Sequence, residues 1–136
     1  MRHKKRSKKL GRSKSHREML MGMLVSALVK EGKITTTVVK AKLARSEAEK
    51  MLTLARKGTL ASRRLVASRL RDEDAAKKLC TEIAPKYKER AGGYTRIVKV
   101  AARKTDGADT AILAWVDPAE TKAVKPMGDE PAKAAE

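Results

Sequence analysis

The residues with the clearest chemical meaning are nine lysines and arginines within the first seventeen positions, a stretch without any acidic residue. Cationic side chains at this density repel one another unless counterions or phosphate groups neutralise them. Residues 1–14 offer little apolar surface beyond Leu10, so they cannot offset the entropy cost of folding alone. Such a segment is either a disordered solubilising arm or an extension that orders along a phosphate backbone, and we favour the second interpretation for residues 1–14.

The residue types that usually perform catalysis form no site in this sequence. His3 and His16 have no acidic neighbour to orient them except Glu18, which we expect to cap a helix, so contact with phosphate or a base is their expected role. Cys80 lies on an apolar helical stripe, where a buried structural thiol is more common than a nucleophile. The acids at 72–74 lack the spacing of a calcium loop. The sequence predicts no enzyme, no metal and no cofactor.

The charge of the whole chain indicates a polyanionic partner. Its 136 residues hold 33 lysines and arginines against 16 acids, which gives a formal net charge of +17. Aromatic residues make up 2%, too few for a surface on which successive bases stack. Pairs of cysteine and histidine for zinc fingers are absent, and no long apolar run fits a membrane span. Recognition of structured RNA by charge and shape is favoured, and a basic DNA-compacting protein is the alternative.

Helical periodicity predicts the elements that position these cations. A first helix at about residues 15–31 begins with Ser15 and Glu18 in capping-box spacing. Its predicted apolar stripe is Leu20, Met23, Leu24, Ala27 and Leu28. A second helix, capped by Thr36 or Thr37 and stopped by Gly58, carries a stripe of small and apolar residues. That stripe is Ala41, Ala44, Ala48, Met51, Leu52 and Ala55.

Two shorter helices follow. Thr59 is predicted to cap a third helix that ends near Leu70 and is anchored by Leu60 and Leu65. The acids at 72–74 favour the first turn of a fourth helix, because the helix dipole is positive there. Its stripe is Ala76, Leu79, Cys80 and Ile83, before Pro85 bends or ends the helix.

Three short β-branched segments predict a small sheet. Residues 94–100 and 110–116 flank a polar turn and suggest an antiparallel hairpin, which residues 33–37 are expected to join. The predicted order is α-β-α-α-α-β-β, an α+β domain at residues 15–116. It has a three-stranded antiparallel or mixed sheet with helices packed on one face. Residues 117–136, rich in proline, alanine and charge, are expected to be a disordered tail.

Inside the domain, three further groups allow a structural or an RNA-binding interpretation. Thr35, Thr36 and Thr37 are either β-formers or a phosphate-binding hydroxyl cluster beside Lys33 and Lys40.

Tyr94 and Arg96 follow two glycines. They begin a strand with the tyrosine in the core, or they contact RNA. The third group is a cluster of arginines that we expect to contact RNA: Arg63, Arg64, Arg69 and Arg71.

Several short motifs together resemble the bacterial-type large-subunit ribosomal protein seventeen family. They are Met-Arg-His at 1–3, Lys-Lys-Leu-Gly-Arg at 8–12, Ser-His-Arg at 15–17, Ile-Thr-Thr-Thr at 34–37, Lys-Ala-Lys at 40–42, Ala-Glu-Lys at 48–50 and Arg-Ala-Gly-Gly-Tyr-Thr-Arg-Ile at 90–97. The resemblance runs from residue 1 to about residue 116 in family order and spacing. It departs at 103–111, where the family usually has a tighter Gly-Asp-Ala-Ala turn.

This resemblance implies a structural constituent of the large ribosomal subunit, located in the cytoplasm, that supports translation. It implies binding to large-subunit (23S) ribosomal RNA near the outer opening of the nascent-chain tunnel. It also implies contact with neighbouring ribosomal proteins, including large-subunit protein thirty-two, and no cofactor, membrane or small-molecule substrate. The residues expected to bind RNA are Arg2, His3, Lys4, Lys5, Arg6, Lys8, Lys9, Arg12, Lys14, His16, Arg17, Lys33, Thr35, Thr36, Thr37, Lys40, Arg63, Arg64, Tyr94 and Arg96.

Overall fold

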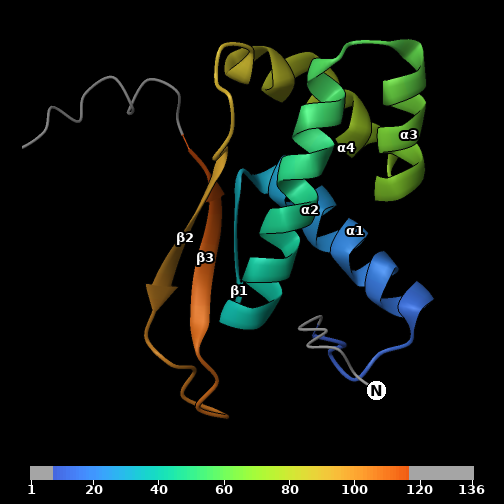
Figure 1. The fold of residues 1–136 in the computed structure, drawn as a ribbon. Coiled ribbons are helices and arrows are strands. Elements are labelled where there is room, and N and C mark those ends of the chain that lie inside the picture. Colours follow the sequence, from blue (N-terminus) through green and yellow to red (C-terminus); the bar gives the residue numbers. More distant parts are fainter. Residues whose placement is uncertain (1–7, 117–136) are drawn as a thin grey trace, which may run out of the picture.

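A computed structural model describes residues 8–116 of the chain (Figure 1). The predicted order α-β-α-α-α-β-β is confirmed, and a π-helical turn η1 and a 3-10 turn η2 follow the fourth helix. The elements are α1 (Lys14–Glu31), β1 (Lys33–Thr37), α2 (Val38–Arg56), α3 (Leu60–Leu70), α4 (Glu73–Lys78), η1 (Leu79–Ile83), η2 (Ala84–Tyr87), β2 (Thr95–Val100) and β3 (Thr110–Trp115).

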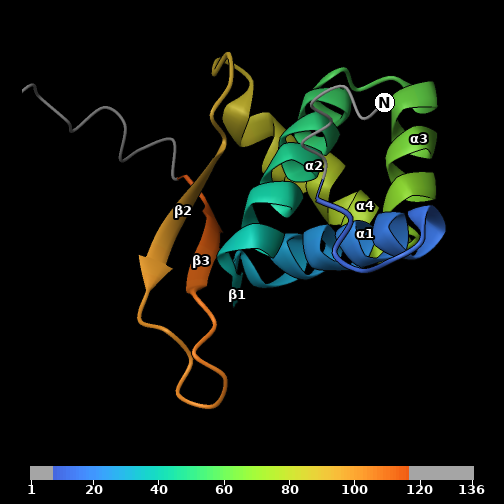
Figure 2. The ribbon, with the colours of Figure 1, turned by 60° about the horizontal axis from the view of Figure 1, so that its bottom comes forward.

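The three strands form one antiparallel sheet in the order β1-β3-β2. Leu113 of the central strand β3 lies opposite Ile34 of β1 and Ile97 of β2, so these three side chains share one face. Leu113 is fully buried, which identifies this face as the side covered by the helices. Figures 1 and 2 show the helices on that one side of the sheet. The α+β fold with helices on one face is confirmed.

The helix α2 is the centre of the core, because it contacts α1, α3 and all three strands. Its buried residues are those of the predicted stripe, from Ala41 to Ala55. Alanine at most of these positions lets neighbouring backbones approach closely, while Met51 and Leu52 fill the wider space. The sequence therefore predicts the face of this helix correctly.

The predicted stripe of α1 is confirmed only in part. Leu28 is fully buried and Leu20 and Leu24 pack against the core, but the buried face is centred on other residues. Met23 is 64% exposed, whereas Met21, Val25 and Val29 are buried in the core. Residues 19–25 in the middle of this helix are all apolar or glycine, so periodicity alone does not select a face. Gly22 provides the physical reason, because a Cβ atom at this position would lie 2.9 Å from the Arg69 carbonyl oxygen. Only a glycine permits this close approach between α1 and the end of α3.

The start of α1 also differs from the prediction. The N-cap is Ser13, with extended backbone angles, and its carbonyl accepts a hydrogen bond from the Arg17 amide at 3.0 Å. Ser15 lies inside the first turn, so the predicted capping box with Glu18 is wrong. Ser13 makes no side-chain capping bond, and its hydroxyl instead lies 3.4 Å from that of Ser15. The helix thus begins just after residue 13.

The ends of α3 and α4 follow the sequence signals, but the buried face of α3 does not. Thr59 accepts the Ser62 amide at 3.2 Å, so its predicted cap is confirmed. Asp72, expected in the first turn of the fourth helix, is instead its N-cap and accepts the Ala75 amide at 3.1 Å, while Glu73 and Asp74 lie in the first turn as predicted. Leu60 is 63% exposed and Leu65 is 41% exposed, so these leucines are not the anchors of α3. The residues that do anchor it are Ser62, Val66 and Leu70.

All three aromatic residues of the chain gather where the sheet meets the helices. The rings of Tyr87 and Tyr94 meet edge to face at 5.6 Å, and Trp115 lies 6.2 Å from Tyr87. The Trp115 indole N–H donates to the Leu28 carbonyl at 3.1 Å, which links β3 to the end of α1. The aromatic side chains are therefore used to join layers of the fold.

Candidate nucleic-acid interface

The segment before α1 forms a tight turn that is held against the body of the protein. Leu10 and Gly11 both have positive φ angles, 55° and 62°, and the Arg12 amide donates to the Lys9 carbonyl at 3.1 Å. Leu10 packs against the core, while Lys8 and Lys9 are exposed. Gly11 adopts the left-handed conformation that this sharp turn requires. The turn therefore holds Lys8 and Lys9 at a defined place on the surface.

Arg12 takes part in this turn rather than projecting from it. Its guanidinium donates to the Leu10 carbonyl at 3.1 Å, and its Nε is buried without a hydrogen-bond partner among the residues the structure describes. The remaining arm residues of the predicted interface lie outside the described residues: Arg2, His3, Lys4, Lys5 and Arg6.

Cations continue from the turn into the first turns of α1 and along α3. Lys14 and His16 are exposed and Arg17 is half-buried at the start of α1. The four arginines of the predicted cluster around α3 are all exposed. We define the unpaired set as the lysines and arginines of this region that form no ion pair with a carboxylate within residues 8–116, apart from Arg12, whose guanidinium is held by the Leu10 carbonyl. The set is Lys8, Lys9, Lys14, Arg17, Arg63, Arg64, Arg69 and Arg71.

Other cations are already paired with carboxylates. Arg45 contacts Glu49 at 3.3 Å and Lys50 contacts Glu47 at 3.2 Å, both along α2. Such pairs on one helix stabilise it only slightly, but in each pair the two opposite charges compensate one another. Arg103 similarly contacts Asp106 at 3.4 Å in the loop between β2 and β3.

A further ion pair joins two helices. The Lys30 ammonium lies 2.6 Å from the carboxylate of Asp72, the N-cap of α4. The hydrogen bond from Lys30, together with that from the Ala75 amide, lowers the pKa of Asp72 below its ordinary value. The same hydrogen bond raises the pKa of Lys30. Both groups are therefore charged at neutral pH and serve the fold.

Arg56 is a structural arginine that sequence reasoning missed. Its guanidinium donates to the carbonyls of Arg90 and Lys88, both at 2.7 Å, and to the hydroxyl of Tyr94. It also lies over the Tyr94 ring, 5.7 Å from the centroid. Its position in the last turn of α2 signals a favourable interaction with the helix dipole, but the loop carbonyls come from residues more than thirty positions away.

The predicted threonine cluster is divided between the two faces of the sheet. Lys33, Thr35 and Thr37 alternate onto the open face, since Ile34 and Thr36 pair with the buried residues of β3. Thr36 therefore points to the helices and is not part of a single hydroxyl cluster. The pairing of Lys33 with Ala114, and of Ala114 with Arg96, brings the two basic residues onto the same open face.

Lys40, predicted beside this cluster, is half-buried near the start of α2.

Tyr94 is a correction to the predicted RNA-binding residues. Its side chain is 2% exposed, and its hydroxyl lies 3.3 Å from the carbonyls of Arg90 and Ala91. A ring enclosed in this way presents no face on which a base could stack. Of the two interpretations of this strand start, the structure supports core packing for Tyr94, whereas Arg96 is exposed.

The described part of the chain contains no helix that is both long and apolar enough to cross a membrane. No group of three metal-ligating side chains gathers within residues 8–116. Cys80 is partly buried on η1, and burial raises the pKa of its thiol, which disfavours the reactive thiolate. What distinguishes the surface is thus its cations.

Comparison with known proteins gives the family. The model of the family described as ribosomal protein L17 matches residues 20–116. The chain belongs to the ribosomal protein L17 family. A relative from Pelobacter propionicus, named large ribosomal subunit protein bL17, is 50% identical over 86% of this chain and 92% of its own length. Relatives of the same name from Sulfurihydrogenibium and Clostridium kluyveri are 49% and 51% identical, over 86% and 80% of this chain and 98% and 96% of their own lengths.

Membership of the L17 family confirms the resemblance inferred from the sequence motifs. A protein of this family is a structural constituent of the ribosome and not an enzyme. The L17 match ends at residue 116, directly after β3, so residues 117–136 lie outside both the family match and the described structure. The unpaired set, in contrast, extends from residue 8 to residue 71 and is carried by α1, α3 and the turn before α1.

Proposed function

We propose that this protein is a structural constituent of the bacterial large ribosomal subunit in the cytoplasm, where it binds large-subunit (23S) ribosomal RNA. The basic extension at residues 1–14 and the unpaired set are the parts that bind the RNA. The observation that carries the proposal is the separation of cations into two groups. Those in ion pairs support the fold, and those of the unpaired set lack an internal counter-charge.

Phosphate groups supply the missing counter-charge. Arginine can donate two parallel hydrogen bonds to one phosphate, and lysine acts as a point charge. The aromatic residues also support binding through phosphate groups rather than through base stacking. Tyr87 and Tyr94 are buried, and the indole N–H of Trp115 donates to the Leu28 carbonyl. Recognition therefore depends on charge and shape, as expected for a folded RNA.

The turn at residues 9–12 explains how body and extension act together. Leu10 anchors the turn against the core, so the extension starts from a defined place beside α1. A tethered cationic segment loses less entropy on binding RNA than a free peptide does, because one end is already fixed. We infer that α1 and α3 dock first and that the extension then follows the phosphate backbone between RNA helices.

The position on the subunit and the protein neighbours are inferred from the family resemblance. We propose a location near the outer opening of the nascent-chain tunnel and contact with neighbouring proteins, including large-subunit protein thirty-two. The open face of the sheet supports a protein contact, because Val98 is 51% exposed and Val100 is 45% exposed on strand β2. Exposed aliphatic side chains side by side on a sheet are favourable to bury against a partner.

Two triple variants of equal charge test RNA binding by the extension. The arm triple replaces Lys4, Lys5 and Lys8 with glutamine. The paired triple replaces the ion-paired residues Lys30, Arg45 and Arg103 with glutamine and is the control. Binding to a large-subunit RNA transcript is measured by filter retention over a salt series.

We expect the arm triple to bind more weakly and to reduce the slope of log affinity against log salt by about 2 to 3. The paired triple should retain the original slope. Equal effects of the two triples would show that only net charge matters and would contradict the proposed interface. Excess duplex DNA as competitor tests the alternative of a DNA-compacting protein, which requires DNA to displace the RNA.

A further inference from the structure

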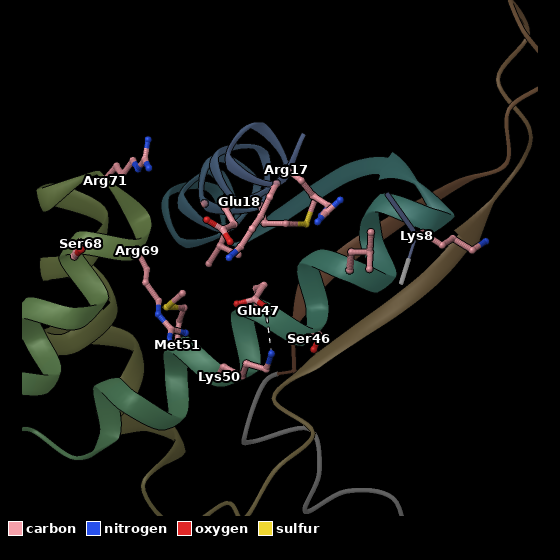
Figure 3. A pocket seen from close by; sticks show the side chains of 15 residues that line it. Lys8, Arg17, Glu18, Ser46, Glu47, Lys50, Met51, Ser68, Arg69 and Arg71 are labelled. Carbon is pink, nitrogen blue, oxygen red and sulfur yellow. Dashed lines mark hydrogen bonds and ion pairs between the residues drawn. The ribbon is translucent and has the colours of Figure 1, made fainter. Parts of the chain in front are cut away.

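A cleft lies between α1, α2 and α3, beside the turn that precedes α1. Its volume is about 760 Å³, which is within the range of pockets that hold small organic ligands. Figure 3 shows side chains from all three helices directed toward the same space. The family description assigns nothing to this cleft, and the sequence patterns gave no indication of it.

The inner part of the cleft is apolar. Met21 and Val25 of α1 and Met51 of α2 line it, and all three are buried in the core. Leu43 of α2, which is half-buried, extends this surface outward. A methionine thioether makes favourable contacts with the edge of an aromatic ring, and its flexible chain adapts to a flat guest. This surface therefore suits a planar heteroaromatic ring.

The outer part of the cleft is cationic. Lys8, Lys14, Arg17, Arg69 and Arg71 line it, and all five belong to the unpaired set. Lys50 also lines it but is engaged by Glu47 at 3.2 Å. Five cations that have no carboxylate partner among residues 8–116 surround one opening, and they create a strong attraction for an anionic group at its rim.

Glu18 gives the cleft a directional polar group. Its carboxylate is exposed, makes no hydrogen bond or ion pair within the described residues, and points into the cleft in Figure 3. A carboxylate only accepts hydrogen bonds, so it favours a ligand with amino donors. A carboxylate would repel a bare phosphate, so Glu18 argues against a simple anion site in the interior.

We propose that this cleft receives one unstacked nucleotide of the large-subunit RNA. The base lies against Leu43 and the small accessible parts of Met21 and Met51, and its amino group donates to Glu18, which favours adenine, cytosine or guanine over uracil. The phosphates flanking the nucleotide contact Arg17 and Arg69. Specific recognition of RNA commonly targets bases that are splayed out of loops and bulges, and a cleft of about 760 Å³ has room for one such base. This inference rests on the proposed RNA-binding function.

The experiment fills the cleft without removing charge. Ser46 of α2 and Ser68 of α3 line the cleft and are exposed, so Ser46→Trp and Ser68→Trp each obstruct it from a different wall. Thr81→Trp, on the exposed side of η1 and away from the cleft lining, is the matched control. Circular dichroism and thermal unfolding of each full-length variant establish that it is folded.

Each variant is bound to the large-subunit RNA transcript and probed in two ways. Base-specific reagents, dimethyl sulfate and kethoxal, report the pairing edges of bases, and hydroxyl radicals report the backbone. With the unmodified protein we expect protection of one unpaired base within a protected stretch of backbone. Ser46→Trp and Ser68→Trp should abolish the base protection and weaken binding by about 10-fold, while backbone protection persists at saturating protein. Thr81→Trp should behave as the unmodified protein.

A Glu18→Gln variant tests the polar contact separately. It keeps the shape of the side chain but replaces one acceptor oxygen with a donor, so we expect reduced protection of the same base. Base protection that survives in both cleft-filling variants would overturn the nucleotide site. An absence of any backbone protection by the unmodified protein would instead overturn the proposed RNA-binding function, so the two failures are distinguishable.

Discussion

The arginine at the end of α2 is bound within the protein, whereas the arginines at the edge formed by α1 and α3 are open to an external partner. Arg56 is surrounded by the carbonyls of Lys88 and Arg90 and by the ring of Tyr94, so its charge is satisfied within the protein. Arg17 and Arg69 face an open cleft and have no carboxylate partner among residues 8–116. Both environments contain a guanidinium group, but only the edge formed by α1 and α3 leaves that group available to an external partner.

The comparison shows why a net charge of +17 does not by itself locate an interface. A cation that holds loop carbonyls contributes to the stability of the folded chain. A cation without an internal partner contributes to solubility until an external anion binds it. The pattern of pairing, rather than the density of lysine and arginine, identifies the surface that faces RNA.

The largest expected effect is a loss of RNA affinity when arginines of the unpaired set on α1 and α3 are neutralised. Arg17, Arg63 and Arg69 together changed to glutamine should weaken binding to large-subunit RNA on the order of 10²-fold and reduce the salt slope by about 3. The free energy of unfolding should change little, because Arg63 and Arg69 are exposed and the half-buried Arg17 forms no ion pair within residues 8–116. Filter binding and urea unfolding measure the two quantities.

The paired triple of Lys30, Arg45 and Arg103 is again the control of equal charge. A similar loss of affinity in both triples would remove the distinction between paired and unpaired cations.

Arg56→Ala should have the converse result. We expect the free energy of unfolding to fall by about 2–3 kcal/mol, because two loop carbonyls and the Tyr94 hydroxyl lose a charged donor. RNA affinity of the fraction that remains folded should be unchanged. Urea unfolding and binding at a temperature where the variant is folded test this. A variant of normal stability that binds RNA poorly would place Arg56 in the interface.

Gly22→Ala examines the contact that brings the two cationic helices together. A Cβ atom at this position meets the Arg69 backbone carbonyl at 2.9 Å, so α1 and α3 must separate. Overpacking of this kind typically costs about 1–3 kcal/mol of unfolding free energy. Alanine is otherwise the better helix former, so an increase in stability by urea unfolding would show that this close approach is absent in solution.

The smallest expected effect is a change in the stability of the folded protein at acidic pH. The hydrogen bonds from Lys30 and Ala75 lower the pKa of Asp72, so its stabilising contribution is present above the ordinary aspartate value of 3.8. That contribution is lost as the pH falls through the lowered pKa of the folded state. Asp72→Asn keeps a capping side chain but cannot titrate. It should therefore lose less stability than the unmodified protein on acidification, as measured by urea unfolding at a series of pH values.

Much of the fold follows from local signals in the sequence. The stripe of α2 is clear because alanines and large apolar residues alternate with charged ones, and Thr59 and Asp72 cap helices as their types predict. The face of α1 was not predictable in this way. Residues 19–25 are apolar on every side, and the true face depends on where Gly22 meets a different helix.

The candidate site was predictable in composition but not in arrangement. Basic residues of the extension and of α3 are evident in the sequence, whereas their common cleft depends on the crossing of α1 and α3. Tyr94 was ambiguous because a tyrosine beside arginines suits a core or an RNA surface equally. The contact with Arg56, thirty-eight residues away, decides between them and has no local signal.

The most direct test is a high-resolution structure of the large ribosomal subunit that contains this chain. The account predicts that the cationic groups of Lys8, Arg17, Arg63 and Arg69 lie within about 3.2 Å of RNA phosphate oxygens, while Arg56 keeps its contacts with Lys88 and Arg90. A structure in which α1 and α3 face solvent, and RNA contacts the region of Arg56 instead, would contradict it.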